Sequence, residues 1–151
     1  MLTIHVYSRY GFEEVTRFTD QNVDEFPNEY FICVHATGWI HAIPYFKQSH
    51  NNVLNLVFDD VSENKKKWIH EYVPIPYNAI ACTQEQANEL KQFIDAIPNY
   101  SNVHVYCAKG QSRSPAIAAY IEEYKNKNIK SEFHFYNYNK HVYKLLKDAR
   151  V

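Results

Sequence analysis

The chain has 151 residues, of which 46% are hydrophobic and 22% charged, the balance of a globular protein rather than a disordered or fibrous one. Sixteen Lys and Arg residues nearly match 17 Asp and Glu residues, which excludes the strongly basic field of a dedicated nucleic-acid binder. No apolar run approaches the roughly 18 residues of a membrane span, and the first residues lack a signal-peptide pattern. We therefore expect a single cytoplasmic domain over residues 1–151 that does not enter a membrane.

Cysteine and histidine spacing argues against disulfides and bound metal. Cys33, Cys82 and Cys107 are odd in number and form no CxxC pair, so we expect free thiols in a reducing compartment. The eight histidines include no HExxH motif and no zinc-finger spacing. His35 and His41 match no ligand pair, so we expect a structural or surface role for them. No metal or other cofactor is expected.

The hydrophobic pattern alternates between strand and helix signals. Four segments are predicted to form strands, namely residues 2–7, 30–36, 53–58 and 102–106. Helices are predicted over residues 84–97, after a capping box that begins at Thr83, over 115–124, with Pro115 at the first position, and over 142–149. This alternation predicts an α/β fold with a central, mostly parallel sheet flanked by helices. Residues 61–82 are predicted to be a long surface connection, and such loops are often functional.

One stretch has the features of an oxyanion-binding nucleophile. Cys107 follows a predicted strand, a short loop with Gly110 comes next, and Arg113 stands at the start of a predicted helix. Backbone N–H groups of such a loop and of a helix N-terminus favour negative charge, and the arginine fork can hold two phosphate oxygens. The same field favours the Cys107 thiolate, the nucleophilic form of cysteine. The pattern predicts attack on phosphorus through a cysteinyl-phosphate intermediate.

The segment from Cys107 to Ser114, Cys-Ala-Lys-Gly-Gln-Ser-Arg-Ser, resembles the phosphate-binding loop of the cysteine-dependent protein tyrosine phosphatases. It is most similar to the small dual-specificity type, whose loop reads Cys-x-x-Gly-x-Ser-Arg-Ser. Residues 6–9, 31–36 and 53–61 and the helix after Pro115 follow the order of compact bacterial and phage members. The resemblance covers most of the chain and implies a single phosphatase domain.

The resemblance also implies roles for individual residues. Cys107 would attack phosphorus, Arg113 would hold the phosphoryl oxygens, and the Ser114 hydroxyl would help the thiolate leave in the second step. The substrate phosphate would lie in the loop formed by Ala108, Lys109, Gly110, Gln111, Ser112 and Arg113.

An aspartic acid from another loop would protonate the leaving oxygen and then activate water. Asp59 and Asp60, at the end of a predicted strand, are the candidates, since loops at strand ends reach the active site of an α/β protein. The register of the resemblance favours Asp60, with Asp59 as the reserve and Glu63 or Glu71 next. A solvated strand end or helix cap is the alternative role of this pair.

The chain departs from the resemblance at two points. Tyr106 replaces the histidine that usually precedes the cysteine and keeps the thiolate poised. Asp60 lies further ahead of Cys107 than in many eukaryotic members, with residues 61–82 as the extra length. A separate loop for clamping phosphotyrosine is not evident.

The expected function is that of a protein phosphatase that hydrolyses phosphotyrosine, with phosphoserine and phosphothreonine as further candidate substrates, and its partner is a phosphorylated protein. Hydrolysis of a lipid or RNA 5′-phosphate is an alternative activity. A non-catalytic phosphopeptide-binding module is the alternative from another class. Such a module would lack the nucleophile or the acid, and both Cys107 and Asp60 are present.

Overall fold

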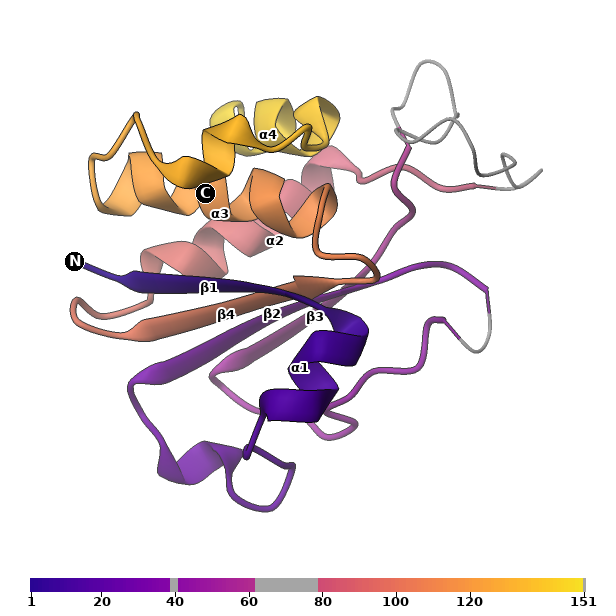
Figure 1. Cartoon of the computed structure of the whole chain (residues 1–151), viewed down its shortest axis with the longest axis vertical. Helices are drawn as coiled ribbons and strands as arrows, with labels where there is room; N and C mark the ends of the chain where they lie inside the picture. The colour runs from indigo at the N-terminus through magenta and orange to yellow at the C-terminus, as the bar shows by residue number, and fades with distance from the viewer. Residues whose placement is uncertain (39–40, 62–78, 151) are drawn as a thin grey trace.

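The computed structural model describes residues 1–38, 41–61 and 79–150 and has an α/β fold (Figure 1). Four strands form one sheet in the order β1-β4-β2-β3. All neighbouring strands in it run parallel, which confirms the predicted central parallel sheet. The strands are β1 (Thr3–Ser8), β2 (Glu29–His35), β3 (Val53–Val57) and β4 (Asn102–Cys107).

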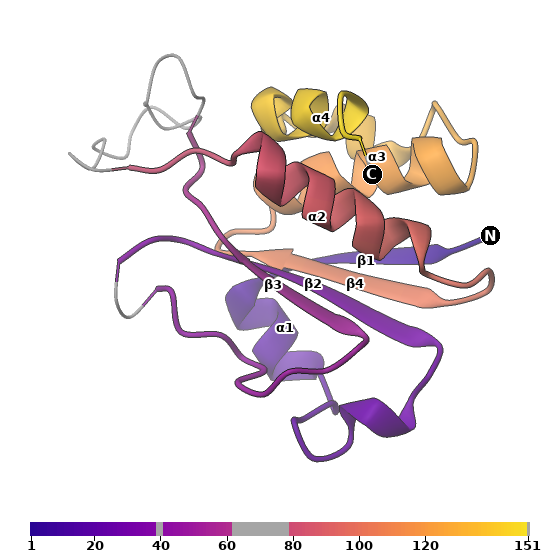
Figure 2. The same ribbon diagram turned by 180° about the vertical axis from the view of Figure 1, so that it is seen from behind.

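Helices cover both faces of this sheet, as Figures 1 and 2 show. One face carries α2 (Gln84–Asp95), α3 (Arg113–Lys125) and α4 (Lys140–Lys147), and the other carries α1 (Arg9–Val15). Short 3-10 helices lie at Val23–Glu25 and Glu132–Phe135. The three predicted helices are confirmed, whereas α1 was not predicted.

Two helix starts show how local sequence sets these elements. The Thr83 hydroxyl accepts a hydrogen bond from the Gln86 backbone N, and the Gln86 side-chain oxygen accepts one from the Thr83 backbone N. The predicted capping box therefore begins α2. Helix α3 begins at Arg113, and Pro115 therefore lies at its third position rather than its first. A proline is tolerated there because the first turn of a helix has no intrahelical acceptor for its N–H groups.

The core has two layers that differ in composition. Between the sheet and helices α2, α3 and α4 the buried side chains are mainly aliphatic, with Ile32, Val105 and Ile117 at the centre. The face that α1 covers is largely aromatic and includes Phe12, Phe31 and Tyr106. Burial on both faces explains why β2, one of the two inner strands, is apolar without interruption from Tyr30 to Val34.

The parallel arrangement fixes where a site can form. All four strands end at one edge of the sheet, and the loops that follow them gather there. In open α/β sheets this edge is where ligands bind. The predicted phosphate loop leaves the inner strand β4 at this edge, and its Cys107 is in register with Ser8 at the end of β1.

Some of the residues singled out in the sequence lie outside the described ranges. Most of the predicted connection 61–82, with the reserve acids Glu63 and Glu71, falls in residues 62–78. Within the described ranges, no helix is long and apolar enough to cross a membrane.

Candidate active site

The Cys107 thiol is the centre of the candidate site. Cys107 is the last residue of β4 and is buried. Its Sγ lies 3.1 Å from the Ser114 Oγ and 3.4 Å from the Ser114 backbone N, which donates to the sulfur. Both contacts come from the first turn of α3, whose N–H groups favour negative charge. The thiol is therefore placed where two donors would stabilise a thiolate.

Arg113 opens α3 and turns its guanidinium toward the end of β3. One of its terminal nitrogens donates to the Phe58 carbonyl oxygen at 2.7 Å, and the side chain is only 5% exposed. Its Nε makes no hydrogen bond to any residue in the described part of the chain. A buried N–H donor without an acceptor is costly, and a phosphoryl oxygen would satisfy it.

Gly110 allows the loop to approach the end of β1 closely. Its φ is +69°, a backbone conformation that residues other than glycine rarely adopt. A Cβ atom at this position would lie 2.6 Å from the Ser8 backbone N and 2.8 Å from the Tyr7 carbonyl oxygen. The loop is further tied to α1 by the Arg9 backbone N, which donates to the Ala108 carbonyl oxygen at 3.3 Å.

The rest of the predicted loop divides into exposed and buried positions. Ala108, Lys109 and Gln111 are exposed, whereas Ser112 is buried at the end of the loop. The Ser112 hydroxyl donates to the Asp60 Oδ1 at 2.7 Å, which joins the predicted phosphate loop to the segment after β3.

Asp60 is thus brought to the loop, as its predicted role requires. It is buried, and its Oδ1 accepts a second hydrogen bond from the Asn139 Nδ2 at 3.0 Å. The Asp59 carboxylate points away from this loop. It accepts hydrogen bonds from the Thr37 backbone N at 2.9 Å, from the Thr37 hydroxyl at 2.6 Å and from the Ile80 backbone N at 2.9 Å. Asp59 therefore joins three loop segments at the sheet edge, and Asp60 is the aspartate in contact with the predicted phosphate loop.

Tyr106, which replaces the usual histidine, contacts a histidine from the neighbouring strand. The Tyr106 hydroxyl lies 2.6 Å from the His35 Nε2. Burial, and then the positive charges of Arg9 and Arg113, lower the pKa of His35 to about 4, so its ring is neutral near pH 7. Burial raises the pKa of the Tyr106 phenol, which stays protonated. The pair is a neutral hydrogen bond beneath the loop.

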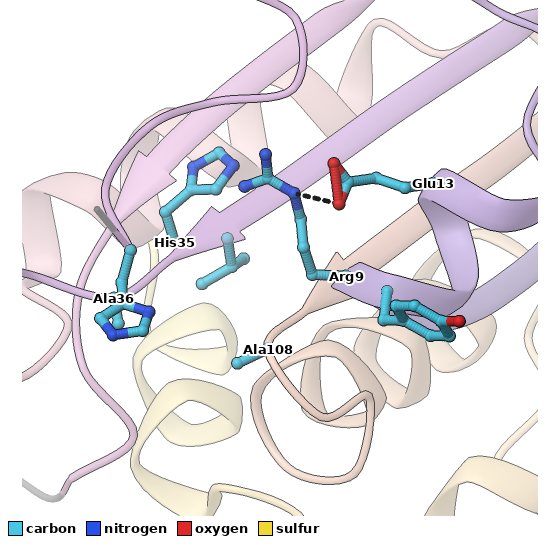
Figure 3. Close-up of a pocket in the computed structure, with 8 residues that line it drawn as sticks. Arg9, Glu13, His35, Ala36 and Ala108 are labelled. Atoms are coloured by element: carbon cyan, nitrogen blue, oxygen red, sulfur yellow. Dashed lines mark ion pairs between the residues drawn. The ribbon is translucent and has the colours of Figure 1, made fainter.

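A cavity of about 420 Å³ opens beside the predicted phosphate loop. Its lining includes Ala108 from the loop, His35 and Ala36 from β2 and its exit, and Arg9 and Glu13 from α1. Figure 3 shows the Arg9 guanidinium between the His35 ring and the Glu13 carboxylate. The Arg9 Nε lies 3.5 Å from the nearer Glu13 oxygen.

Three residues around this site were not expected to belong to it. Arg9 was noted only as part of a similar segment, and His35 was expected to be structural or at the surface. Asn139 was not considered, although an Asn before a helical segment is a typical N-cap signal. Asn139 caps α4 by accepting from the Val142 backbone N at 3.1 Å, and its own backbone N donates to the Ser112 carbonyl oxygen at 3.2 Å.

The other two cysteines differ from Cys107 in their surroundings. All three are free, and burial raises the pKa of both Cys33 and Cys82 to about 12, so these two thiols stay protonated near neutral pH. In the described ranges, no group of three or more His, Cys, Asp or Glu side chains is arranged to hold a metal ion.

Comparison with known proteins adds no further constraint. The chain has no significant match among family models, curated proteins or solved structures. The site itself combines a buried thiol with two donors, a buried arginine whose Nε has no hydrogen bond to the described residues, and an aspartate joined to the same loop.

Proposed function

We propose that the protein is a cysteine-dependent phosphatase that hydrolyses phosphate monoesters, with phosphotyrosine in proteins as the substrate. The observation that carries this proposal is the arrangement at the end of β4. There the Cys107 sulfur accepts a hydrogen bond from the Ser114 backbone N–H, and the Nε of the buried Arg113 makes no hydrogen bond to any described residue. The resemblance of residues 107–114 to the phosphatase loop supports the same chemistry.

In the first step the Cys107 sulfur forms a bond to phosphorus as the ester P–O bond breaks. Arg113 and the loop N–H groups hold the three equatorial oxygens, where negative charge is spread in the transition state. Asp60 gives its proton to the leaving oxygen, which departs as a neutral alcohol or phenol. The product of this step is a cysteinyl phosphate.

In the second step water attacks the same phosphorus atom and the S–P bond breaks. Asp60, now a carboxylate, accepts a proton from the water, and inorganic phosphate is released. The sulfur leaves as a thiolate, which the Ser114 hydroxyl and backbone N–H, at 3.1 and 3.4 Å, stabilise.

The test is hydrolysis of p-nitrophenyl phosphate and a phosphotyrosine peptide in EDTA, with and without vanadate. The wild-type protein should turn over both, and vanadate should inhibit it. Cys107→Ser should abolish turnover while phosphate-analogue binding persists, because Arg113 and the loop remain.

Cys33→Ala and Cys82→Ala are the matched controls, since these thiols are buried away from the chemistry and should leave turnover intact in a protein folded by circular dichroism. Wild-type turnover by Cys107→Ser would overturn the covalent mechanism. Binding of phosphopeptide without turnover by the wild-type protein would indicate a binding module. Preference for a lipid or RNA 5′-phosphate in the same assay would replace the proposed substrate.

A further inference from the structure

The cavity beside the phosphate loop has a feature that the proposed reaction does not use. It extends from Ala108, the residue after the nucleophile, toward the first turns of α1. A phosphate ester bound in the loop would direct its leaving group into space next to the loop. The cavity is therefore the place where the part of the substrate beyond the phosphate would bind, and its lining bears on substrate choice.

Two buried nitrogen atoms around this cavity lack a well-formed hydrogen bond to the described residues. The His35 Nδ1 and the Arg9 Nε make no hydrogen bond within the described ranges, although the Glu13 carboxylate lies 3.5 Å from that Nε. The His35 side chain is 3% exposed. When the Tyr106 hydroxyl donates to the His35 Nε2, the ring proton lies on Nδ1, which is then a buried donor with a contact to the Leu56 backbone too poor in geometry to count as a hydrogen bond. Both nitrogens would be satisfied by an oxygen acceptor.

The charges around the cavity favour an anion. The guanidinium groups of Arg9 and Arg113 both act electrostatically on His35, which is itself neutral near pH 7. Glu13 is the opposing charge, but its ion pair with Arg9 is partly exposed and long and contributes little stability, so an acidic group of a ligand can compete with Glu13 for the guanidinium. Of the remaining lining, Val34, Ala36 and Ala108 are apolar and suit a carbon spacer, whereas Tyr10 and His41 add polar atoms.

We propose that this cavity is a second acidic-group subsite, in which Arg9 and His35 bind a carboxylate or second phosphoryl group carried by the leaving group of the substrate. The proposal rests on the proposed function, because it places the leaving group next to Cys107. It narrows the substrate class from phosphate monoesters in general to esters with an acidic group beyond an apolar spacer.

The first experiment compares 4-carboxyphenyl phosphate with 4-carbamoylphenyl phosphate, which have similar shapes but differ in charge. The wild-type protein should have a lower KM for the carboxylate, by about tenfold, the order expected for a hydrogen bond to a charged group. Arg9→Gln should remove this preference. Glu13→Gln should increase the preference for the carboxylate compound because the competing carboxylate is gone. Glu14→Gln, an exposed change on the same helix, is the control and should leave this preference unchanged.

A second measurement separates the subsite from the chemistry. Cys107→Ser binds ligand without turnover, so calorimetry with both compounds reports affinity even if no hydrolysis occurs. A carboxylate preference that needs Arg9 supports the subsite, whatever the activity. Equal KM and affinity for the two compounds would overturn the subsite and leave the phosphatase proposal intact.

The source of the acidic group is resolved by two further substrates. Phosphotyrosine peptides with flanking Asp and with flanking Asn test a carboxylate from a protein, and a bisphosphorylated small molecule tests a second phosphoryl group. The substrate whose KM rises in Arg9→Gln carries the group that this subsite binds. If neither substrate responds to Arg9→Gln, the proposal is wrong for both sources.

Discussion

Asp59 and Asp60 are adjacent in sequence but their carboxylates have different surroundings. Asp59 accepts three hydrogen bonds, which engage both of its oxygens and join the segments at Thr37 and Ile80. Asp60 accepts bonds from Ser112 and Asn139, both at Oδ1, and its Oδ2 accepts none from the described residues. A proton on Asp60 would therefore reside on Oδ2, the oxygen available to a leaving group.

This difference predicts unequal effects of two isosteric substitutions. Asp60→Asn should lower kcat for a phosphotyrosine peptide by roughly 10²–10⁴, the range of general acid–base catalysis, and less for p-nitrophenyl phosphate, whose leaving group is more acidic. Asp59→Asn should mainly destabilise the fold, by about 1–3 kcal/mol, because an amide would oppose the N–H donors it now accepts from. Steady-state kinetics from pH 5 to 8 and urea unfolding distinguish the two. A larger kinetic effect at Asp59 would show that the acid is the first aspartate.

At the scale of elements, the site depends on the loop between β4 and α3 lying against the end of β1. Gly110→Ala would place a Cβ atom within 3 Å of three backbone atoms of Tyr7 and Ser8, so either the loop or the strand end must move. A displacement of about 1 Å in a catalytic group can cost 10²-fold in rate, and we expect a loss of roughly that size in kcat/KM. Gln111→Ala, an exposed change in the same loop, is the control and should stay close to wild type. Near-normal kinetics of Gly110→Ala would contradict the close approach.

Helix α4 reaches the site through its N-cap. Asn139 is fully buried and uses its Oδ1 to cap α4 and its Nδ2 to hold Asp60. Asn139→Ser keeps a hydroxyl that can cap the helix but loses the amide donor, so it separates the two roles. Asn139→Ala loses both and should also destabilise the protein by about 0.5–2 kcal/mol.

If Asn139 positions Asp60, the serine variant should retain stability but lose kcat on phosphotyrosine peptide by about tenfold, on the order of one lost hydrogen bond to a charged group. The loss should be smaller for p-nitrophenyl phosphate, which depends less on the acid. Thermal unfolding together with kcat on both substrates makes the comparison. Equal losses on the two substrates would show that Asn139 acts only on the fold.

The sequence predicted those elements whose signals are local. The capping box at Thr83 and the strand that leads into Cys107 were both found, because each depends on a few neighbouring residues. Helix α1 was missed because it has only seven residues, contains a glycine and buries one side chain, Phe12, which leaves no helical period to detect.

Contacts between distant segments had no local signal. Asn139 and Asp60 are 79 positions apart, and Tyr106 and His35 are 71 apart, so their proximity follows from the order of the strands. A parallel sheet could be predicted from alternating strands and helices, but the order β1-β4-β2-β3 could not. The cavity between α1 and the β2 end was unforeseen for the same reason.

For the whole molecule, one polar cluster makes stability depend on pH. His50, just before β3, has its Nε2 2.7 Å from an Asp20 oxygen and its Nδ1 3.0 Å from Asp24. Both ring nitrogens face carboxylates, so the contacts require the doubly protonated ring. Burial alone would lower the pKa of His50, but the hydrogen bonds and charges of Asp20 and Asp24 outweigh it and raise the pKa above 6.5.

A raised histidine pKa stabilises the folded state fully below about pH 6.5 and less as the pH rises through the folded-state pKa. His50→Gln should therefore lower the free energy of unfolding by about 1–2 kcal/mol at pH 6 and by less at pH 9. His35 and His104, whose pKa values are lowered mainly by burial, act in the opposite direction below about pH 6.5, but they cancel in the difference between wild type and variant. Urea unfolding at both pH values measures that difference.

Asp24→Asn, which breaks only one of the two contacts, should give a smaller change of the same sign, and Glu25→Gln should give none. A loss for His50→Gln that is equal at pH 6 and pH 9 would mean that the ring acts by packing and not through its charge.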